Sequence, residues 1–141
     1  MQAETNRIDE LLECLVFLTR FYGVPNSKDA LTTGLPLVSG LLTPNLFSRA
    51  AERGGLSARE VIQPLADISS LLLPCVLQMR NGGACILLEW NEDRTQGKVI
   101  FPQAGDAAEW LGIAQLGDEY LGRLFFVKKQ FKFDDRSPKV L

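Results

Sequence analysis

The sequence contains no histidine, and this absence excludes a wide range of chemistry. Without an imidazole the chain has no Ser-His or Cys-His nucleophilic pair, no histidine metal ligand and no histidine general base. Cysteine is also scarce: the chain has three. An odd number cannot all pair in disulfides within the chain, and no CxxC spacing of the kind that binds zinc occurs. Each cysteine lies in an apolar stretch, so we expect buried thiols rather than a disulfide or a metal site, and no cofactor. The three are Cys14, Cys75 and Cys85.

Long apolar runs and an excess of positive charge are absent as well. No run approaches the roughly 18 apolar residues that cross a bilayer, and the start, MQAETNRIDE, is too polar for a signal peptide. The 15 basic and 17 acidic residues give a net charge of −2, which does not favour nucleic acid. The basic residues near the C-terminus are interrupted by Asp134 and Asp135, which favours a solvated tail over a membrane-proximal basic patch. We expect a soluble, cytosolic chain.

The chain has 141 residues, 46% of them hydrophobic, which suits one domain. Its first third is helical in pattern. Asn6 is the expected cap of a helix with apolar residues from 8 to 22 at spacings of three and four, and Gly23 is its stop. Ser27 begins a short turn of helix to residue 31. Thr43 and Pro44 begin another helix, which the glycines at 54 and 55 end.

From residue 56 the pattern becomes extended. Residues 56–65 fit a strand or a weak helix, while 74–79 and 84–90 flank the hairpin turn Asn81-Gly82-Gly83. Residues 98–101 form a short strand, which Pro102 ends because proline cannot donate to a ladder. Helical turns are expected from 106 or 107 to 110 and from 115 to 121, and a last strand at 123–129. Helices followed by an antiparallel meander make an α+β fold.

The order of elements and several strings resemble the N-terminal peptidase domain of bacterial ABC exporters, whose active members cut double-glycine leaders. DELLECL and RFYG occupy the frame of the family's first helix, Asp-Cys-Gly-x-Ala-Cys-Leu followed by an aromatic pair and glycine. LPCVLQMRNGGACILLEW is similar to the family's central hairpin. The resemblance implies a papain-like cysteine peptidase fold with N-terminal helices packed on an antiparallel sheet. The matching first-helix residues are Asp9, Cys14, Leu15, Tyr22 and Gly23.

Four positions depart from the family's catalytic pattern. Glu10 stands where the nucleophilic cysteine belongs, and Ala84 stands where the histidine belongs. Pro102 takes the place of the orienting aspartate, and Glu4 that of the oxyanion-hole glutamine. None of these residues can activate a thiolate or stabilise an oxyanion in the required way. We therefore expect a degenerate domain that is not an enzyme.

Strings such as LVFLTRFYG, LTPNLFSRAAERGGLSAR and FKFDDRSP resemble the degenerate domain of type I secretion ATPases, above all the LapB-like exporters of giant RTX adhesins. The resemblance implies a soluble domain at the cytoplasmic face of the bacterial inner membrane, in a full-length protein that is an ATPase. Its partners would be the unfolded RTX or adhesin polypeptide, which it tethers, and the rest of the transporter. Residues 1–133 would form this domain, and 134–141 would begin a linker toward transmembrane helices. The alternative is a regulatory or interaction module that contacts the exporter without binding substrate.

Several residues are candidates for holding an extended polypeptide along a sheet edge or groove. Simpler interpretations also apply. Glu10 suits a helix terminus, Trp90 and Trp110 suit core packing, and Gln78 with Arg80 suits a polar outer strand face. The space left at Ala84 favours a groove on this side of the hairpin. The candidate binding residues are Glu10, Tyr22, Gln78, Arg80, Ala84 and Trp90.

Overall fold

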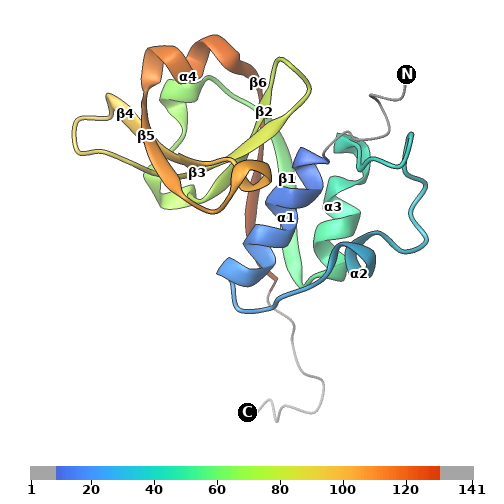
Figure 1. Ribbon diagram of the computed structural model, residues 1–141. Helices are drawn as coiled ribbons and strands as arrows, with labels where there is room; N and C mark the ends of the chain where they lie inside the picture. Colours follow the sequence, from blue (N-terminus) through green and yellow to red (C-terminus); the bar gives the residue numbers. More distant parts are fainter. Residues whose placement is uncertain (1–8, 131–141) are drawn as a thin grey trace, which may run out of the picture.

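The computed structural model describes residues 9–130, which form four helices and one six-stranded antiparallel sheet (Figure 1). The predicted α+β class is confirmed. No helix within this range is long and apolar enough to cross a membrane. Glu4, the predicted cap Asn6 and the predicted linker 134–141 lie outside the described residues, so the domain boundaries stay a prediction. The helices are α1 (Glu10–Phe21), α2 (Lys28–Thr32), α3 (Pro44–Arg53) and α4 (Ile113–Glu119).

The cap of α1 is Asp9, because its carboxylate accepts a hydrogen bond from the Leu12 amide at 3.2 Å. The prediction of Asn6 as the cap of this helix was wrong, because the helix begins at Glu10 and Asp9 caps it. Ser27 caps α2 as predicted, accepting from the Ala30 amide. Helix α3 begins at the predicted proline and ends before two glycines, although the Thr43 side chain makes no capping hydrogen bond.

The sheet has the strand order β1-β6-β2-β3-β4-β5, with all neighbours antiparallel. The predicted hairpin is confirmed as β2 and β3. The prediction of a simple meander was wrong, because the last strand, β6, lies between β1 and β2 in the sheet. Residues 56–62 are a strand, one of the two forms considered for them. The strands are β1 (Leu56–Ile62), β2 (Cys75–Met79), β3 (Ala84–Trp90), β4 (Gln96–Ile100), β5 (Ala108–Gly112) and β6 (Tyr120–Lys129).

The predicted helical turn at 106–110 is also wrong. Residues 108–112 form β5, which pairs with β4 from Gln96 opposite Gly112 to Ile100 opposite Ala108. The helical segment that follows is confirmed as α4. The turn before β5 is η4 (Pro102–Ala104), a 3-10 turn that begins at the proline predicted to end β4. Local pattern could not identify β5, because an exposed edge strand lacks the apolar alternation of a half-buried one.

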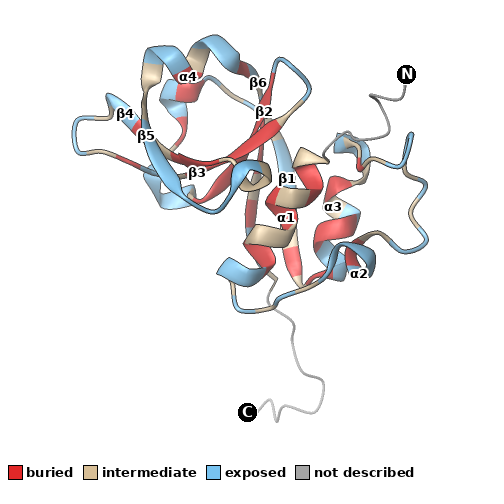
Figure 2. Ribbon diagram, viewed as in Figure 1, coloured by how far each residue is buried: buried red, intermediate tan, exposed pale blue. Residues whose placement is uncertain are grey.

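Each face of the sheet is covered, which places two cores on its opposite sides (Figures 1 and 2). Successive residues of β2 alternate between them, as a strand requires. Val76 packs with α1 and α3, whereas Cys75 and Leu77 pack with α4 and the 3-10 turn η2 (Leu65–Asp67). A second 3-10 turn, η3 (Ser70–Leu72), has no buried residue. In the core on the helix side, the rings of Phe47 and Phe125 stack with centroids 4.2 Å apart. In the same core, Leu11 and Leu15 of α1 pack with Ile86 of β3, which holds α1 against the β2–β3 hairpin.

Arg94 ties the β3–β4 turn to the segment that precedes β2. Its guanidinium donates to the carbonyls of Ala66 and Ile68 at 2.9 and 2.8 Å and lies 4.7 Å from the centre of the Trp90 ring. Arg94→Ala should lower the free energy of unfolding by about 1 kcal/mol, because both carbonyls and the ring lose a cationic partner. Urea unfolding measures this. Arg80→Ala is the matched control, since Arg80 is exposed and its side chain makes no ion pair within residues 9–130. Equal losses in both variants would contradict the prediction.

Candidate functional site

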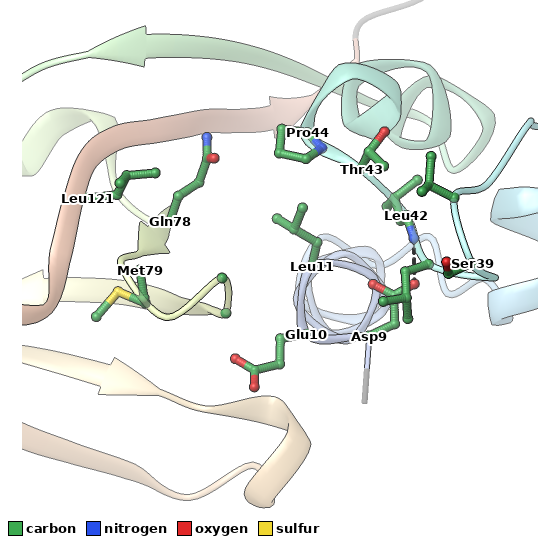
Figure 3. Close-up of a pocket in the computed structure, with 14 residues that line it drawn as sticks. Asp9, Glu10, Leu11, Ser39, Leu42, Thr43, Pro44, Gln78, Met79 and Leu121 are labelled. Carbon is green, nitrogen blue, oxygen red and sulfur yellow. Dashed lines mark hydrogen bonds between the residues drawn. The ribbon is translucent and has the colours of Figure 1, made fainter. Parts of the chain in front are cut away.

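A groove of about 410 Å³ lies at the N-terminal end of α1 (Figure 3). One wall is the loop 38–44 and the other is formed by the β2–β3 turn, Gln78 and Leu121. The floor contains the first residues of α1, which the core on the helix side holds against β3. Four segments that are far apart in the sequence, the start of α1, loop 38–44, the β2–β3 hairpin and Leu121 of β6, thus meet at one open groove.

Asp9 joins the floor of the groove to the loop wall. One carboxylate oxygen accepts from the Leu12 amide, and the other accepts from the Leu42 amide at 2.7 Å (Figure 3). Burial raises the pKa of Asp9, and the two hydrogen bonds from Leu42 and Leu12 oppose that shift. The residue therefore holds the loop in place through an anionic acceptor.

Glu10 joins the same floor to the hairpin wall. Its Oε1 accepts a hydrogen bond from the backbone amide of Ala84 at 2.9 Å, across 74 positions of sequence. The positions at which the resemblance places nucleophile and base are therefore neighbours in space. The register that pairs Ile86 with Ile100 runs toward Ala84 and Pro102, but the ladder ends before it reaches them. Glu10 and Ala84 are thus joined by a hydrogen bond, while Pro102 begins η4 beyond the last residue pair of the ladder.

The structure gathers only part of the predicted set of binding residues. Glu10 and Gln78 line the groove, and Ala84 reaches it through its backbone amide while its side chain is buried. Tyr22 lies at the other end of α1, where its hydroxyl donates to the Val127 carbonyl at 2.9 Å.

The other two candidates do not line the groove. Trp90 is buried in the core on the α4 side, and its ring N–H donates to the Ile68 carbonyl, as expected for core packing. Arg80 is exposed beside a separate surface hollow.

Gln78 requires a correction, because it does not lie on a polar outer face. Its side chain is 6% exposed, and its amide nitrogen donates to the Glu60 carboxylate at 2.7 Å. The alternation along β2 was interpreted as a half-solvated strand, but strands β3 and β6 flank β2 and both of its faces are covered. A buried amide at the groove wall is held in one orientation by this hydrogen bond.

The loop 38–44 is the part of the site that sequence reasoning missed. Val38 and Leu41 pair in an isolated bridge around a tight turn, in which Ser39 has a φ of 54° and Gly40 a φ of 77°. The signal was present as apolar residues on both sides of Ser-Gly, a pattern typical of turns. Leu121 was missed as well, and it is 49% exposed at the opposite wall.

The thiols are far from reactive. Burial raises the pKa of Cys14 well above its ordinary value, raises that of Cys85 to about 12, and raises that of Cys75 as well. All three cysteines are free and buried, as predicted. No group of three His, Cys, Asp or Glu side chains within residues 9–130 is placed to hold a metal ion. The groove therefore contains carboxylate and backbone groups that can accept hydrogen bonds, next to apolar walls.

The folded protein should therefore resist alkylation. A thiol with a pKa of about 12 is thiolate in only about one molecule in ten thousand at pH 8, and burial adds a steric barrier. We expect no modification by iodoacetamide over an hour at pH 8, and three modified cysteines in guanidinium chloride. Mass spectrometry counts the adducts. Rapid labelling of one cysteine in the folded protein would contradict this.

Comparison with solved structures first defines the class of fold. The peptidase domain of Streptococcus ComA, a bi-functional ABC transporter involved in a quorum sensing pathway, has a TM-score of 0.72 and 16% identity, over 86% of this chain and 92% of that one. A double glycine motif protease from an AMS/PCAT transporter, solved in complex with the leader peptide, has a TM-score of 0.69 and 14% identity, over 89% and 88%. The fold is therefore that of a transporter peptidase domain, which confirms the predicted fold class.

A nearer relative then gives the family. The N-terminal peptidase C39-like domain of the toxin secretion ATP-binding protein from Vibrio parahaemolyticus is 42% identical, with a TM-score of 0.83 over 88% of this chain and 99% of that one. The chain belongs to the family of peptidase C39-like N-terminal domains of ABC transporters. No protein-family model matches the chain, and no curated protein matches it.

Proposed function

We propose that this chain is a non-catalytic member of its family, which tethers an unfolded RTX or adhesin polypeptide in the groove during type I secretion. The observation that carries the proposal is the Glu10–Ala84 hydrogen bond. At the two positions that the resemblance assigns to nucleophile and base, the chain has a carboxylate bound to a backbone amide. Beside this contact an open groove of about 410 Å³ remains available for a polypeptide.

Two further observations support the non-catalytic part. The sequence has no imidazole to generate a thiolate, and burial keeps all three thiols protonated at neutral pH. Acyl transfer by a cysteine requires an activated thiolate within reach of the substrate. Neither condition is met by a buried cysteine with a raised pKa.

The tethering part is supported by the shape and lining of the groove. Its walls expose apolar side chains next to hydrogen-bonding groups, which is how extended segments are held elsewhere. The resemblance to LapB-like exporters favours an RTX adhesin as the bound chain and the cytoplasmic face of the inner membrane as the location. The rest of the transporter, including its ATPase, is the second partner. Ordering an unfolded chain is unfavourable, so we expect weak binding.

Two measurements test this proposal. Titration of the ¹⁵N-labelled chain with an unfolded, calcium-free RTX segment that includes the sequence on both sides of its repeats should shift the amide signals of loop 38–44 and of the β2–β3 turn. An unchanged spectrum at millimolar segment would contradict tethering. A fluorogenic double-glycine peptide should remain intact under the same conditions. Thiol-dependent cleavage of that peptide would overturn the non-catalytic part.

A second candidate function is that of an interaction module, which contacts another part of the exporter instead of the substrate. It is favoured by a second cavity, of about 480 Å³, at the far end of α1. Tyr22, Arg59 and Phe126 line this cavity beside Leu71 and Leu72, which are 91% and 46% exposed. A titration of the ¹⁵N-labelled chain with the exporter's ATPase domain tests this second function. Shifts of amide signals confined to the residues that line this cavity would favour it.

A further inference from the structure

The charge of the groove has one sign. Among the described residues that line it, the ionisable side chains are the carboxylates of Asp9 and Glu10, and no lysine or arginine is present. Neither carboxylate forms an ion pair within residues 9–130, whereas Glu13, further along α1, pairs with Lys28. The floor of the groove therefore attracts cations and repels anions.

The structure holds the Glu10 carboxylate at the groove. The Ala84 amide donates to its Oε1, and the turn approaches so closely that a Cβ on Gly83 would overlap the same oxygen. Its second oxygen, Oε2, accepts no hydrogen bond from any residue in 9–130, while both oxygens of Asp9 accept backbone hydrogen bonds. Figure 3 shows the Glu10 side chain extending from α1 on the side of the hairpin turn. Glu10 is the less compensated of the two charges.

Apolar side chains stand on both sides of this charge. Val38 is 61% exposed on the loop wall, and Leu121 is 49% exposed on the opposite wall. The other apolar residues that line the groove are Leu11, Leu41, Leu42, Pro44 and Met79. A chain lying in the groove would place apolar side chains against these walls and its own charge over the floor. The arrangement is complementary to a cation between two apolar residues.

We infer that the groove selects extended polypeptide segments in which a lysine or arginine lies between apolar residues, and that it disfavours aspartate-rich segments. This inference rests on the proposed function of the groove. Its consequence for cargo is specific, because each RTX repeat of the pattern Gly-Gly-x-Gly-x-Asp contains an aspartate. The groove therefore takes cargo segments outside the repeats.

The test uses three 12-residue peptides that differ at one central position, flanked by leucine and valine, where they carry Lys, Gln or Asp. Each is titrated into the ¹⁵N-labelled chain at low ionic strength. We expect the lysine peptide to bind about tenfold more tightly than the aspartate peptide, with glutamine between them, and the ratio to shrink as salt is added. A peptide of the RTX repeat pattern, without calcium, should bind as weakly as the aspartate peptide.

Glu10→Gln separates charge from structure, because its amide oxygen still accepts from the Ala84 amide. We expect this variant to bind the lysine and glutamine peptides equally, with the Ala84 amide signal retained. Glu92→Gln, on the exposed β3–β4 turn, is the matched control, because it removes the same charge far from the groove and should keep the preference.

The outcomes separate the two proposals. If no peptide shifts the signals of the groove, the proposed function fails. If the three peptides bind in the groove with equal affinity, the charge preference is overturned while tethering stands. Equal weakening of the preference in both variants would show an effect of net charge alone, and this too would overturn the inference.

Discussion

Replacing Phe47 by alanine is expected to lower the free energy of unfolding by about 3–5 kcal/mol, because a large ring is removed from a fully buried site. Phe47 lies on α3, and its ring stacks on Phe125 of β6 with centroids 4.2 Å apart. Both rings are buried in the core between the helices and the sheet. A domain of this size has a total stability of about 5–15 kcal/mol, so the loss is a large share of it. Urea or thermal unfolding followed by circular dichroism measures the change.

Phe21→Ala is the control of matched chemistry. Phe21 is 52% exposed at the end of α1, and its removal should cause a loss below about 1 kcal/mol. Phe47→Leu keeps most of the side-chain volume, so its loss of unfolding free energy should lie between those of Phe47→Ala and Phe21→Ala. This variant can be measured even if Phe47→Ala does not fold. A Phe47→Ala variant as stable as Phe21→Ala would refute the packing described for the core on the helix side.

The second large effect is expected at Gly83, where alanine should lower the free energy of unfolding by about 2 kcal/mol. The backbone of Gly83 lies outside the left-handed region, so an L-residue can adopt it, but a Cβ there would overlap the Glu10 carboxylate. Glu10 must then leave the Ala84 amide, which loses a charged acceptor in a buried setting. The reduced flexibility of the unfolded chain offsets a smaller part of this loss.

A double-mutant cycle identifies the cause. In a Glu10→Ala background the obstructing carboxylate is gone, so Gly83→Ala should be neutral or slightly stabilising. The expected coupling between the two positions is about 2 kcal/mol, well above the roughly 0.5 kcal/mol within which independent sites add. Additive losses would mean that the substitution acts through the turn itself and not through Glu10. Chemical denaturation of the four proteins supplies the cycle.

The helices of this fold could be predicted from local chemistry. Ser27, Pro44 and the glycines after α3 each act within a few residues of the chain, and the structure places the boundaries of α2 and α3 next to them. The β2–β3 hairpin is equally local, because its turn type follows from Asn81 and the glycines after it. The position of β6 could not be predicted in this way, since pairing of Phe126 with Arg59 and Cys75 depends on segments about 50 to 70 residues away.

The candidate site was also predicted only in part. The resemblance brought Glu10 and Ala84 together, and the structure joins them by a hydrogen bond. Burial of Gln78 was missed, because a polar residue in a strand indicates solvent unless its partner is known, and the partner here is Glu60 on β1. Loop 38–44 is held at the groove by the hydrogen bond from the Leu42 amide to Asp9. This contact joins residues 33 positions apart, so no local sequence pattern could predict it.

The place of β6 in the sheet also determines when the fold can be completed during synthesis. Strand β1 pairs with β6 alone, and β2 has β6 as one of its two neighbours, so residues 120–129 join β1 to the rest of the sheet. While those residues are still inside the ribosome, the emerging chain presents β1 without a partner and β2 with one open edge. Such edges are templates for pairing with other chains. We therefore expect the sheet to be completed only after residues 120–129 have left the ribosome, because they supply the one neighbour of β1 and a neighbour of β2.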